Sequence, residues 1–270
     1  MSGSVVDAAQ AAALARSRPG GMRELMLSLL PQAAAYAIAP ISGYTVGAVA
    51  RGTSGSLYLG ANMEYAGTAL SFTLHAEQSA TINAWQNGEQ GLKAIAVSSA
   101  PCGYCRQFLY ELTTAQRLFV HIAGKRSRRL TTLLREPFGP EDLPNANPPL
   151  MTPQDHGLTL VAPSSDALVL DALAAANASY APHTGDYAGV AVETASGAVY
   201  AGRYAENAAF NPGVSPLESA LTMRVLDGHA DDAVTRAVLV ETASKASQEG
   251  ATRELLRVVS AAKLDVYAAA

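Results

Sequence analysis

The chain contains an internal repeat, and this repeat restricts its possible folds more than any other feature of the sequence. A shift of 142 residues superimposes eight residues of one segment on identical residues of another. The matched residues are Pro40, Gly43, Gly47, Ser54, Gly55, Tyr58, Gly60 and Glu64 in the first copy, and Pro182, Gly185, Gly189, Ser196, Gly197, Tyr200, Gly202 and Glu206 in the second. One constant offset through a predicted β-hairpin and its turn indicates two similar domains that were duplicated and then diverged.

The pattern of apolar residues in the first copy predicts alternating strands and helices. The predicted segments are strands at Tyr44–Arg51, Ser56–Met63 and Leu92–Ser99, and helices at His75–Asn87 and from Cys102 to about Thr113. Such alternation is typical of α/β proteins, in which helices pack on a sheet. We therefore predict an α/β fold built from two duplicated three-layer α/β/α domains.

A proline-rich stretch separates the two copies. Six prolines occur from Glu136 to Pro153, with Pro153 included, in a segment without apolar periodicity. We predict a linker over residues 142–159, a first domain over 21–141 and a second domain over 160–270. Residues 1–20 are expected to form a separate N-terminal segment.

Composition narrows the class of protein. The chain has 270 residues, of which 49% are hydrophobic, and a formal net charge of −4. This charge argues against nucleic acid as the main partner. No uninterrupted apolar stretch is long enough to span a membrane, and the N-terminus lacks a basic leader before its apolar run. We expect a cytoplasmic protein without a membrane partner.

The only two cysteines lie in one turn. Cys102 and Cys105 follow Pro101, a residue that favours the first turn of a helix, and their spacing of three puts both on one helix face. His75 and Glu77 would diverge by roughly 200° in mid-helix and converge only at a helix N-terminus. One imidazole and two thiolates are three zinc ligands with a fourth position open, which is typical of a catalytic site. We predict one Zn²⁺ per chain.

Glu77 is predicted to be the catalytic residue. Two positions from a metal ligand, it is close enough to take a proton from an activated water and pass it to a substrate nitrogen. The second copy has Val214–Ala220, VSPLESA, in place of Leu74–Ala80, LHAEQSA, and it contains no cysteine. The first domain is therefore predicted to be catalytic and the second degenerate.

Two further polar residues end the second predicted strand. Asn62 and Glu64 point the same way, because side chains alternate along a strand. An amide and a carboxylate in this arrangement could bind a diol. Alternatively, Asn62 could cap the end of the strand and Glu64 could be a solvated charge.

Several motifs together resemble the cytidine deaminase family, within it the long, two-domain, homodimeric type of bacteria and plants. His-x-Glu followed by Pro-Cys-x-x-Cys is typical of zinc nucleobase deaminases. The other matching stretches, between about Pro31 and the C-terminus, are VGA, GANME, FGPEDL, QDHG and YAENAAFNP. The resemblance implies hydrolysis of cytidine and 2′-deoxycytidine to the uridines and ammonia, a step of pyrimidine salvage.

The resemblance also implies roles for individual residues. These are zinc ligation by His75, Cys102 and Cys105, proton transfer by Glu77, ribose binding by Asn62, Met63 and Glu64, and base stacking by Tyr44. Two positions depart from the family pattern, which has Phe at Tyr44 and His at Tyr104. The family's second domain helps to build the homodimer, and its loop, here Glu206–Pro212, closes the partner's pocket.

Three other interpretations remain open. A nucleotide or nucleic-acid deaminase would share the zinc ligands but need a basic surface; the run Lys125–Arg129 is better explained as a solvated loop. A deaminase of another aminated heterocycle would differ only in its pocket walls. In a non-catalytic zinc-binding module, Glu77 would have no structural role.

Overall fold

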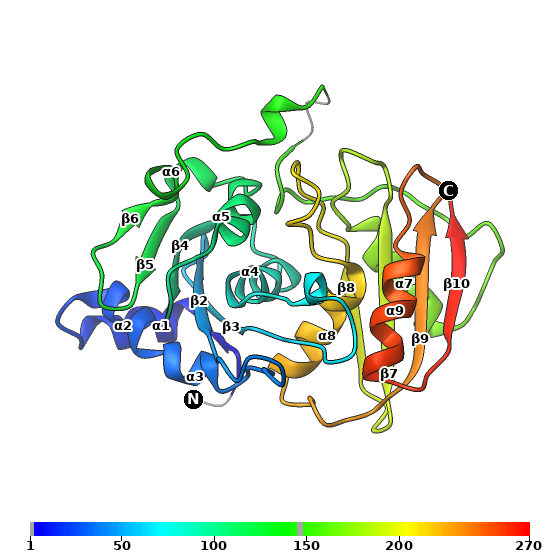
Figure 1. Cartoon of the computed structure of the whole chain (residues 1–270), viewed down its shortest axis with the longest axis horizontal. Coiled ribbons are helices and arrows are strands. Elements are labelled where there is room, and N and C mark those ends of the chain that lie inside the picture. The colour runs from blue at the N-terminus through cyan, green and yellow to red at the C-terminus, as the bar shows by residue number, and fades with distance from the viewer. Residues whose placement is uncertain (1–2, 145–147) are drawn as a thin grey trace. The chain divides into compact units, whose positions relative to one another are not determined.

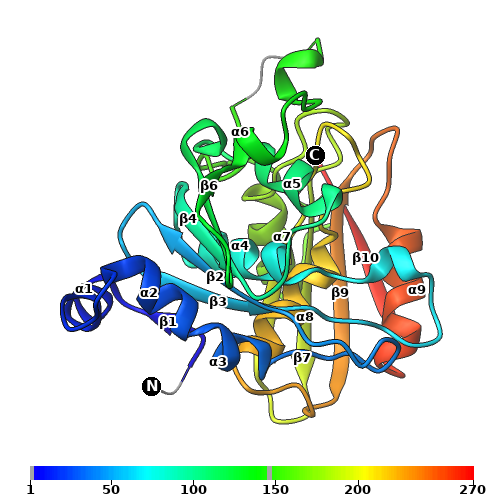
Figure 2. The same cartoon turned by 60° about the vertical axis from the view of Figure 1, so that its left-hand side comes forward.

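Two units, each with its own sheet, make up the structure (Figures 1 and 2). The computed structural model describes residues 3–144 and 148–270. The first unit comprises residues 1–64 and 73–152, and the second comprises 65–72 and 153–270. Residues 145–147, which fall inside the predicted linker, lie outside the described residues.

The described part of the first unit has a six-stranded sheet in the order β1-β3-β2-β4-β5-β6. Its strands are β1 Val5–Val6, β2 Gly47–Gly52, β3 Leu57–Ala61, β4 Leu92–Val97, β5 Phe119–Ile122 and β6 Arg128–Arg129. Its helices are α1 Ala8–Arg16, α2 Gly21–Ser28, α3 Leu30–Ala34, α4 Ala76–Gln86, α5 Gly103–Tyr110 and α6 Leu130–Leu133, with 3₁₀ turns η2 Ala115–Arg117 and η3 Pro140–Asp142.

The described part of the second unit has a four-stranded sheet in the order β10-β9-β7-β8. Its elements are η1 Leu70–Phe72, α7 Ala167–Asn177, β7 Ala188–Thr194, β8 Val199–Arg203, α8 Pro216–Leu226, β9 Val234–Thr242, α9 Glu249–Val259 and β10 Leu264–Ala269. The order β8-β7-β9-β10 repeats β3-β2-β4-β5 of the first unit, with the same two antiparallel pairings followed by a parallel one. The predicted duplication is thus confirmed in the strand topology.

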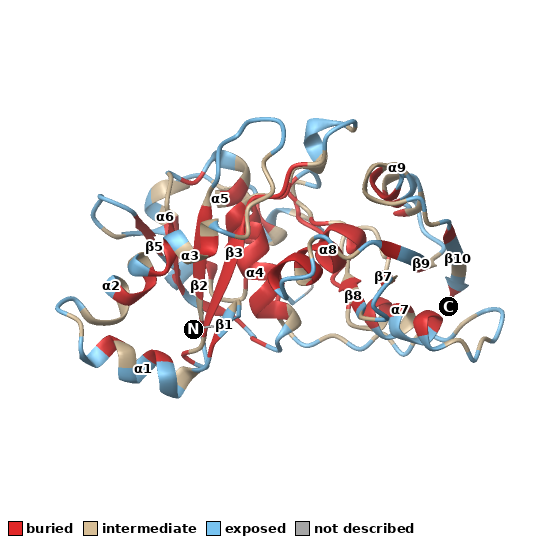
Figure 3. Ribbon diagram, turned by 90° about the horizontal axis from the view of Figure 1, so that it is seen from below, coloured by how far each residue is buried: buried red, intermediate tan, exposed pale blue. Residues whose placement is uncertain are grey.

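Side-chain alternation along the strands explains the three layers. In β7, Val190 and Val192 pack with α8 and α9, whereas Ala191 between them packs with α7 on the opposite face. In the first unit, residues of α1, α2 and α3 share a core with Val49. Figure 3 shows buried residues along β2, β3 and α4. The predicted α/β/α layering is confirmed.

The repeated glycines mark places where a helix backbone lies directly on a strand. A Cβ atom at Gly60 would lie 2.1 Å from the backbone of α4, and one at Gly202 would lie 2.2 Å from the backbone of α8. On the opposite faces, Gly47 and Gly189 approach the backbones of α3 and α7, where a Cβ would be at 2.4 and 2.3 Å. These contacts leave no room for a side chain, so both copies keep glycine.

The N-terminal residues contribute to the first unit. Strand β1 pairs antiparallel with β3, and helix α1 begins after Asp7, whose carboxylate accepts a hydrogen bond from Gln10 N–H. Ala11 of α1 is fully buried in the core that α1, α2 and α3 share with the sheet. Among the described residues, none of the helices combines the length and apolar character needed to cross a bilayer.

Candidate active site

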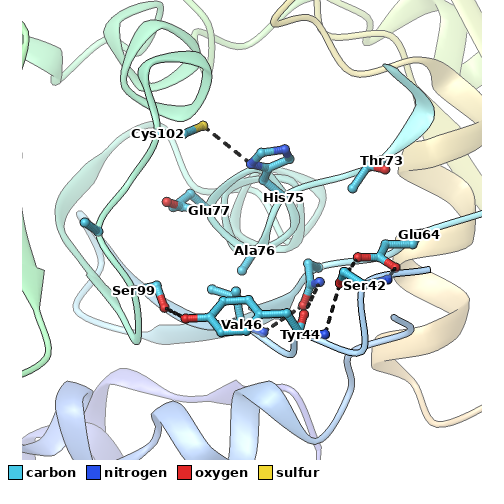
Figure 4. Close-up of a pocket in the computed structure, with 12 residues that line it drawn as sticks. Ser42, Tyr44, Val46, Glu64, Thr73, His75, Ala76, Glu77, Ser99 and Cys102 are labelled. Carbon is cyan, nitrogen blue, oxygen red and sulfur yellow. Dashed lines mark hydrogen bonds between the residues drawn. The ribbon is translucent and has the colours of Figure 1, made fainter. Parts of the chain in front are cut away.

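The N-terminus of α4 brings His75 and Glu77 to one place. His75 is the capping residue, with an extended backbone, and its N–H donates to the side-chain oxygen of Gln78 at 3.0 Å. Glu77 lies in the first turn and is 4% exposed. Because both residues are at the helix end, their side chains face the same space (Figure 4).

The N-terminus of α5 supplies the two thiols. Cys102 caps the helix, and its sulfur accepts a hydrogen bond from Cys105 N–H at 3.4 Å. Cys105 is fully buried, whereas Cys102 is exposed. Both cysteines are free thiols.

The separations among these donors suit a tetrahedral zinc ion. The two sulfurs lie 3.6 Å apart, and the His75 Nδ1 atom lies 3.6 Å from Cys102 Sγ and 3.2 Å from Cys105 Sγ. Typical Zn–S and Zn–N bonds at tetrahedral angles place two sulfurs about 3.8 Å apart and a sulfur and nitrogen about 3.6 Å apart. His75, Cys102 and Cys105 thus form a possible zinc-binding site. No other cluster of three or more histidine, cysteine or acidic side chains with this proximity occurs in residues 3–144 and 148–270.

The acidities of these groups reflect their close contact. Hydrogen bonds from Cys105 and His75 lower the pKa of the Cys102 thiol to about 3, which favours a thiolate. The contact with Cys102, together with burial, raises the pKa of Cys105. Burial also raises the pKa of the Glu77 carboxyl, although hydrogen bonds from its own backbone N–H and from Cys105 oppose this effect.

A cavity of about 300 Å³ opens over the donors. Its walls are Ser42, Tyr44, Val46, Asn62, Glu64, Thr73, His75, Ala76, Glu77, Ser99, Ala100 and Cys102. Of the residues predicted from the sequence, two do not line it. Cys105 is fully buried, and so is Met63, which stands in the sequence between two residues that line the cavity.

Asn62 and Glu64 hold the loop that precedes β2. The Asn62 amide oxygen accepts from Val46 N–H at 2.8 Å, and its NH₂ group donates to the Tyr44 carbonyl at 2.9 Å. The Glu64 carboxylate accepts from the N–H groups of Ile41 and Ser42, both at 2.9 Å, and from the Ser42 hydroxyl. Burial would raise the pKa of Glu64, but the hydrogen bonds from Ser42 and Ile41 lower it overall, so this group is ionised at neutral pH.

The second unit repeats the contact of Glu64 but not that of Asn62. Glu206, at the matched position, accepts from the N–H groups of His183 and Thr184, the matched residues of the corresponding loop. Tyr204 stands where the first copy has Asn62. Loop anchoring by the carboxylate is therefore a property of the repeated fold, whereas the asparagine belongs to the first copy.

Ser42, Thr73 and Ser99 are polar cavity residues that the sequence analysis missed. Ser99 follows β4, and Asn62 follows β3, which runs parallel to β4 because both pair antiparallel with β2. Asn62 and Ser99 thus follow two parallel strands on either side of β2, and polar residues after parallel strands gather at the same sheet edge; this was the available signal.

The similarity of this chain to known proteins indicates its family. Models of the cytidine and deoxycytidylate deaminase zinc-binding region match residues 22–122 and 130–253. A cytidine deaminase of Shewanella sediminis is 45% identical over 261 residues, covering 96% of this chain and 87% of the relative. One from Photorhabdus laumondii is 47% identical over 244 residues, covering 90% and 82%.

The chain belongs to the cytidine deaminase family. A crystal structure of the cytidine deaminase from Mycobacterium tuberculosis is 33% identical and covers 43% of this chain and 96% of its own, with a TM-score of 0.40.

Within this family fold, the second unit lacks the donors of the first. Ser215 caps α8 as His75 caps α4, and its hydroxyl accepts from Glu218 N–H. Leu217 occupies the place of Glu77 and is fully buried in the apolar core. The second unit contains no cysteine. A second zinc site of this type is therefore absent from the described residues of this unit.

Proposed function

We propose that this protein is a zinc-dependent enzyme that hydrolytically deaminates cytidine and 2′-deoxycytidine to uridine and 2′-deoxyuridine, releasing ammonia in pyrimidine salvage. The observation that carries the proposal is the buried Glu77 carboxyl beside three zinc donors at a nucleoside-sized cavity. A cytoplasmic location suits the two free thiols, because reducing conditions preserve them.

His75, Cys102 and Cys105 would hold the zinc, which when bound supplies Lewis-acid activation of a water molecule. Glu77 takes a proton from this water and delivers it to N3 of the base, so that C4 becomes electrophilic as the water oxygen bonds to it. Glu77 then moves the second water proton to the amino nitrogen, and the C4–N bond breaks with release of ammonia.

The cavity walls would orient the nucleoside. The exposed Tyr44 ring provides a stacking surface for the pyrimidine. Glu64 can accept about four hydrogen bonds in all, and the loop supplies three, so one acceptor position remains for the ribose 3′-hydroxyl. Asn62 would assist at the sugar, while Met63 would contribute only as the spacer between them.

Turnover of cytidine by the purified protein tests the proposal directly. Cytidine absorbance should fall while uridine and ammonia appear in equal amounts. Parallel assays with 2′-deoxycytidine, a cytidine monophosphate, free cytosine and adenosine separate the nucleoside deaminase from the other candidate activities. Turnover of the phosphorylated substrate alone, or of none of them, would contradict the proposed function.

Glu64→Gln should weaken recognition of the sugar. Glutamine keeps the size of the side chain but loses the charge-assisted acceptor, and we expect kcat/KM for cytidine to fall by roughly tenfold or more. The wild type should prefer cytidine over 3′-deoxycytidine, and the variant should treat them alike. A wild type without this preference, or a variant that retains it, would remove the 3′-hydroxyl contact.

We also propose that two chains share their active sites in a homodimer, with the first unit catalytic and the second completing the partner's cavity. The loop Glu206–Pro212 supports this role. Phe210 is 59% exposed and has a φ of 59°, a left-handed conformation that is strained for a bulky residue. Asn207 fixes the loop, since its side-chain oxygen accepts from Ala209 N–H and its carbonyl accepts from Phe210 N–H. A rigid loop that exposes an aromatic ring is suited to contact another molecule.

Mixed dimers should recover activity from two inactive parents. A Glu77→Gln chain retains its loop, and a Phe210→Ala chain retains its catalytic residues, so their heterodimer has one intact site. Random re-association of equal amounts should restore about one quarter of the wild-type activity, since half of the dimers are mixed. Mixing Glu77→Gln with His75→Ala is the control and should restore none. Heterodimers that form without rescue, or a fully active monomer in sedimentation, would contradict shared sites.

A further inference from the structure

The Tyr44 side chain reaches across the cavity to Ser99. Its ring is 61% exposed, yet its hydroxyl lies 2.7 Å from the Ser99 hydroxyl (Figure 4). Tyr44 belongs to the loop before β2, and Ser99 follows β4. The hydrogen bond therefore joins two walls of the same cavity.

The loop fixes the backbone of Tyr44 but not its ring. The Tyr44 N–H donates to the Ser42 hydroxyl at 3.0 Å, and its carbonyl accepts from Asn62 at 2.9 Å. An aromatic ring as exposed as this one is only weakly restrained by packing and retains rotamer freedom. The contact with Ser99 restrains the ring at its far end.

Ser99 is itself held in place. Its neighbour Ser98 exchanges hydrogen bonds with Gly47 of β2: Ser98 N–H donates to the Gly47 carbonyl, and Gly47 N–H donates to the Ser98 hydroxyl, at 3.0 and 3.1 Å. On the other side, Pro101 restricts the chain before α5. The hydrogen-bond partner of the Tyr44 hydroxyl is thus attached to the edge of the sheet.

We propose that Ser99 is a positioning residue that fixes the Tyr44 ring in the orientation in which it stacks on the pyrimidine. The inference rests on the proposed function and adds a residue and a contact to it. Preorganising an exposed ring lowers the entropic cost of binding the base. The ring touches the base before and after the chemical step, so the contact should affect KM rather than kcat.

Steady-state kinetics with cytidine test this arrangement in a double-mutant cycle. Tyr44→Phe and Ser99→Ala should each raise KM by roughly two- to tenfold with kcat little changed, the range expected for one hydrogen bond. The double variant should be no worse than either single variant, because each removes the same interaction. Ser99→Thr keeps a hydroxyl and should restore a KM near that of the wild type. Calorimetric affinity for uridine should follow the same order.

Tyr58→Phe is the matched control. It also deletes a hydrogen-bonded tyrosine hydroxyl, which donates to Glu89 at 3.1 Å, but Tyr58 does not line the cavity. Its KM should equal that of the wild type. Unchanged KM in Tyr44→Phe, additive effects in the double variant, or a loss confined to kcat would overturn the positioning role while cytidine turnover stands. A wild type that does not deaminate cytidine would overturn both the proposed function and this inference.

Discussion

Replacing Glu77 with glutamine is expected to lower kcat for cytidine by about 10²–10⁴-fold, the usual contribution of a general acid–base group. Glutamine preserves the size of the side chain and can still hydrogen-bond, but it cannot accept the proton of water or deliver one to N3. Glu77 is buried beside the zinc donors, so bulk water has little access to replace it. Steady-state kinetics, with metal analysis of the same sample, measure the effect.

The fold and the metal content should survive this change, because the three proposed zinc ligands remain. Glu89→Gln is a suitable control: Glu89 is also a buried carboxylate, but it binds Ser54 and Tyr58 outside the cavity. This control should affect the thermal midpoint more than kcat. Near-normal turnover by the Glu77 variant would exclude Glu77 from the mechanism.

The purified protein is expected to contain one zinc per chain and to lose essentially all activity when a chelator removes it. The first unit supplies one imidazole and two thiols at tetrahedral separations, whereas the second unit has Ser215 in the place of His75 and contains no cysteine. Added zinc should restore the chelated wild type. Cys105→Ala should neither retain zinc nor be restored, because two remaining protein donors bind the ion too weakly.

His229→Ala is the control variant for the measurement of zinc content. His229 contacts the Tyr200 hydroxyl in the second unit and has no part in the donor cluster, so this variant should keep its zinc. Two zinc ions per chain, or iron in place of zinc, would contradict the assignment. Full activity after complete removal of the metal would contradict the mechanism.

Properties that depend on nearby residues were predictable. The apolar pattern predicted the segments that form α4 and β4, each within a few residues of its observed bounds. Local spacing also places Cys102 and Cys105 on one helix face, since the geometry of a helix turn is independent of the rest of the fold. The constant offset of the glycines predicted two copies, and the structure explains it, because a side chain at Gly60 or Gly202 would collide with a helix backbone.

Properties that depend on distant residues were not predictable. The sequence offered Asn62 and Glu64 as diol-binding groups, and only the folded chain shows that both also hold the loop that carries Tyr44.

Glu77 and Ser99 differ in what determines them: the sequence for the first and the tertiary structure for the second. The sequence by itself determined the chemistry expected at the site, because few sites other than a catalytic zinc site combine a histidine, two cysteines and a glutamate at helix N-termini. Only the tertiary structure decided the shape of the cavity and the orientation of its walls. Tyr44 and Ser99 are 55 residues apart in the chain, and their hydroxyls meet because β2 and β4 pair in one sheet. No local pattern encodes such a contact, since its existence depends on the register of strands that the whole core fixes.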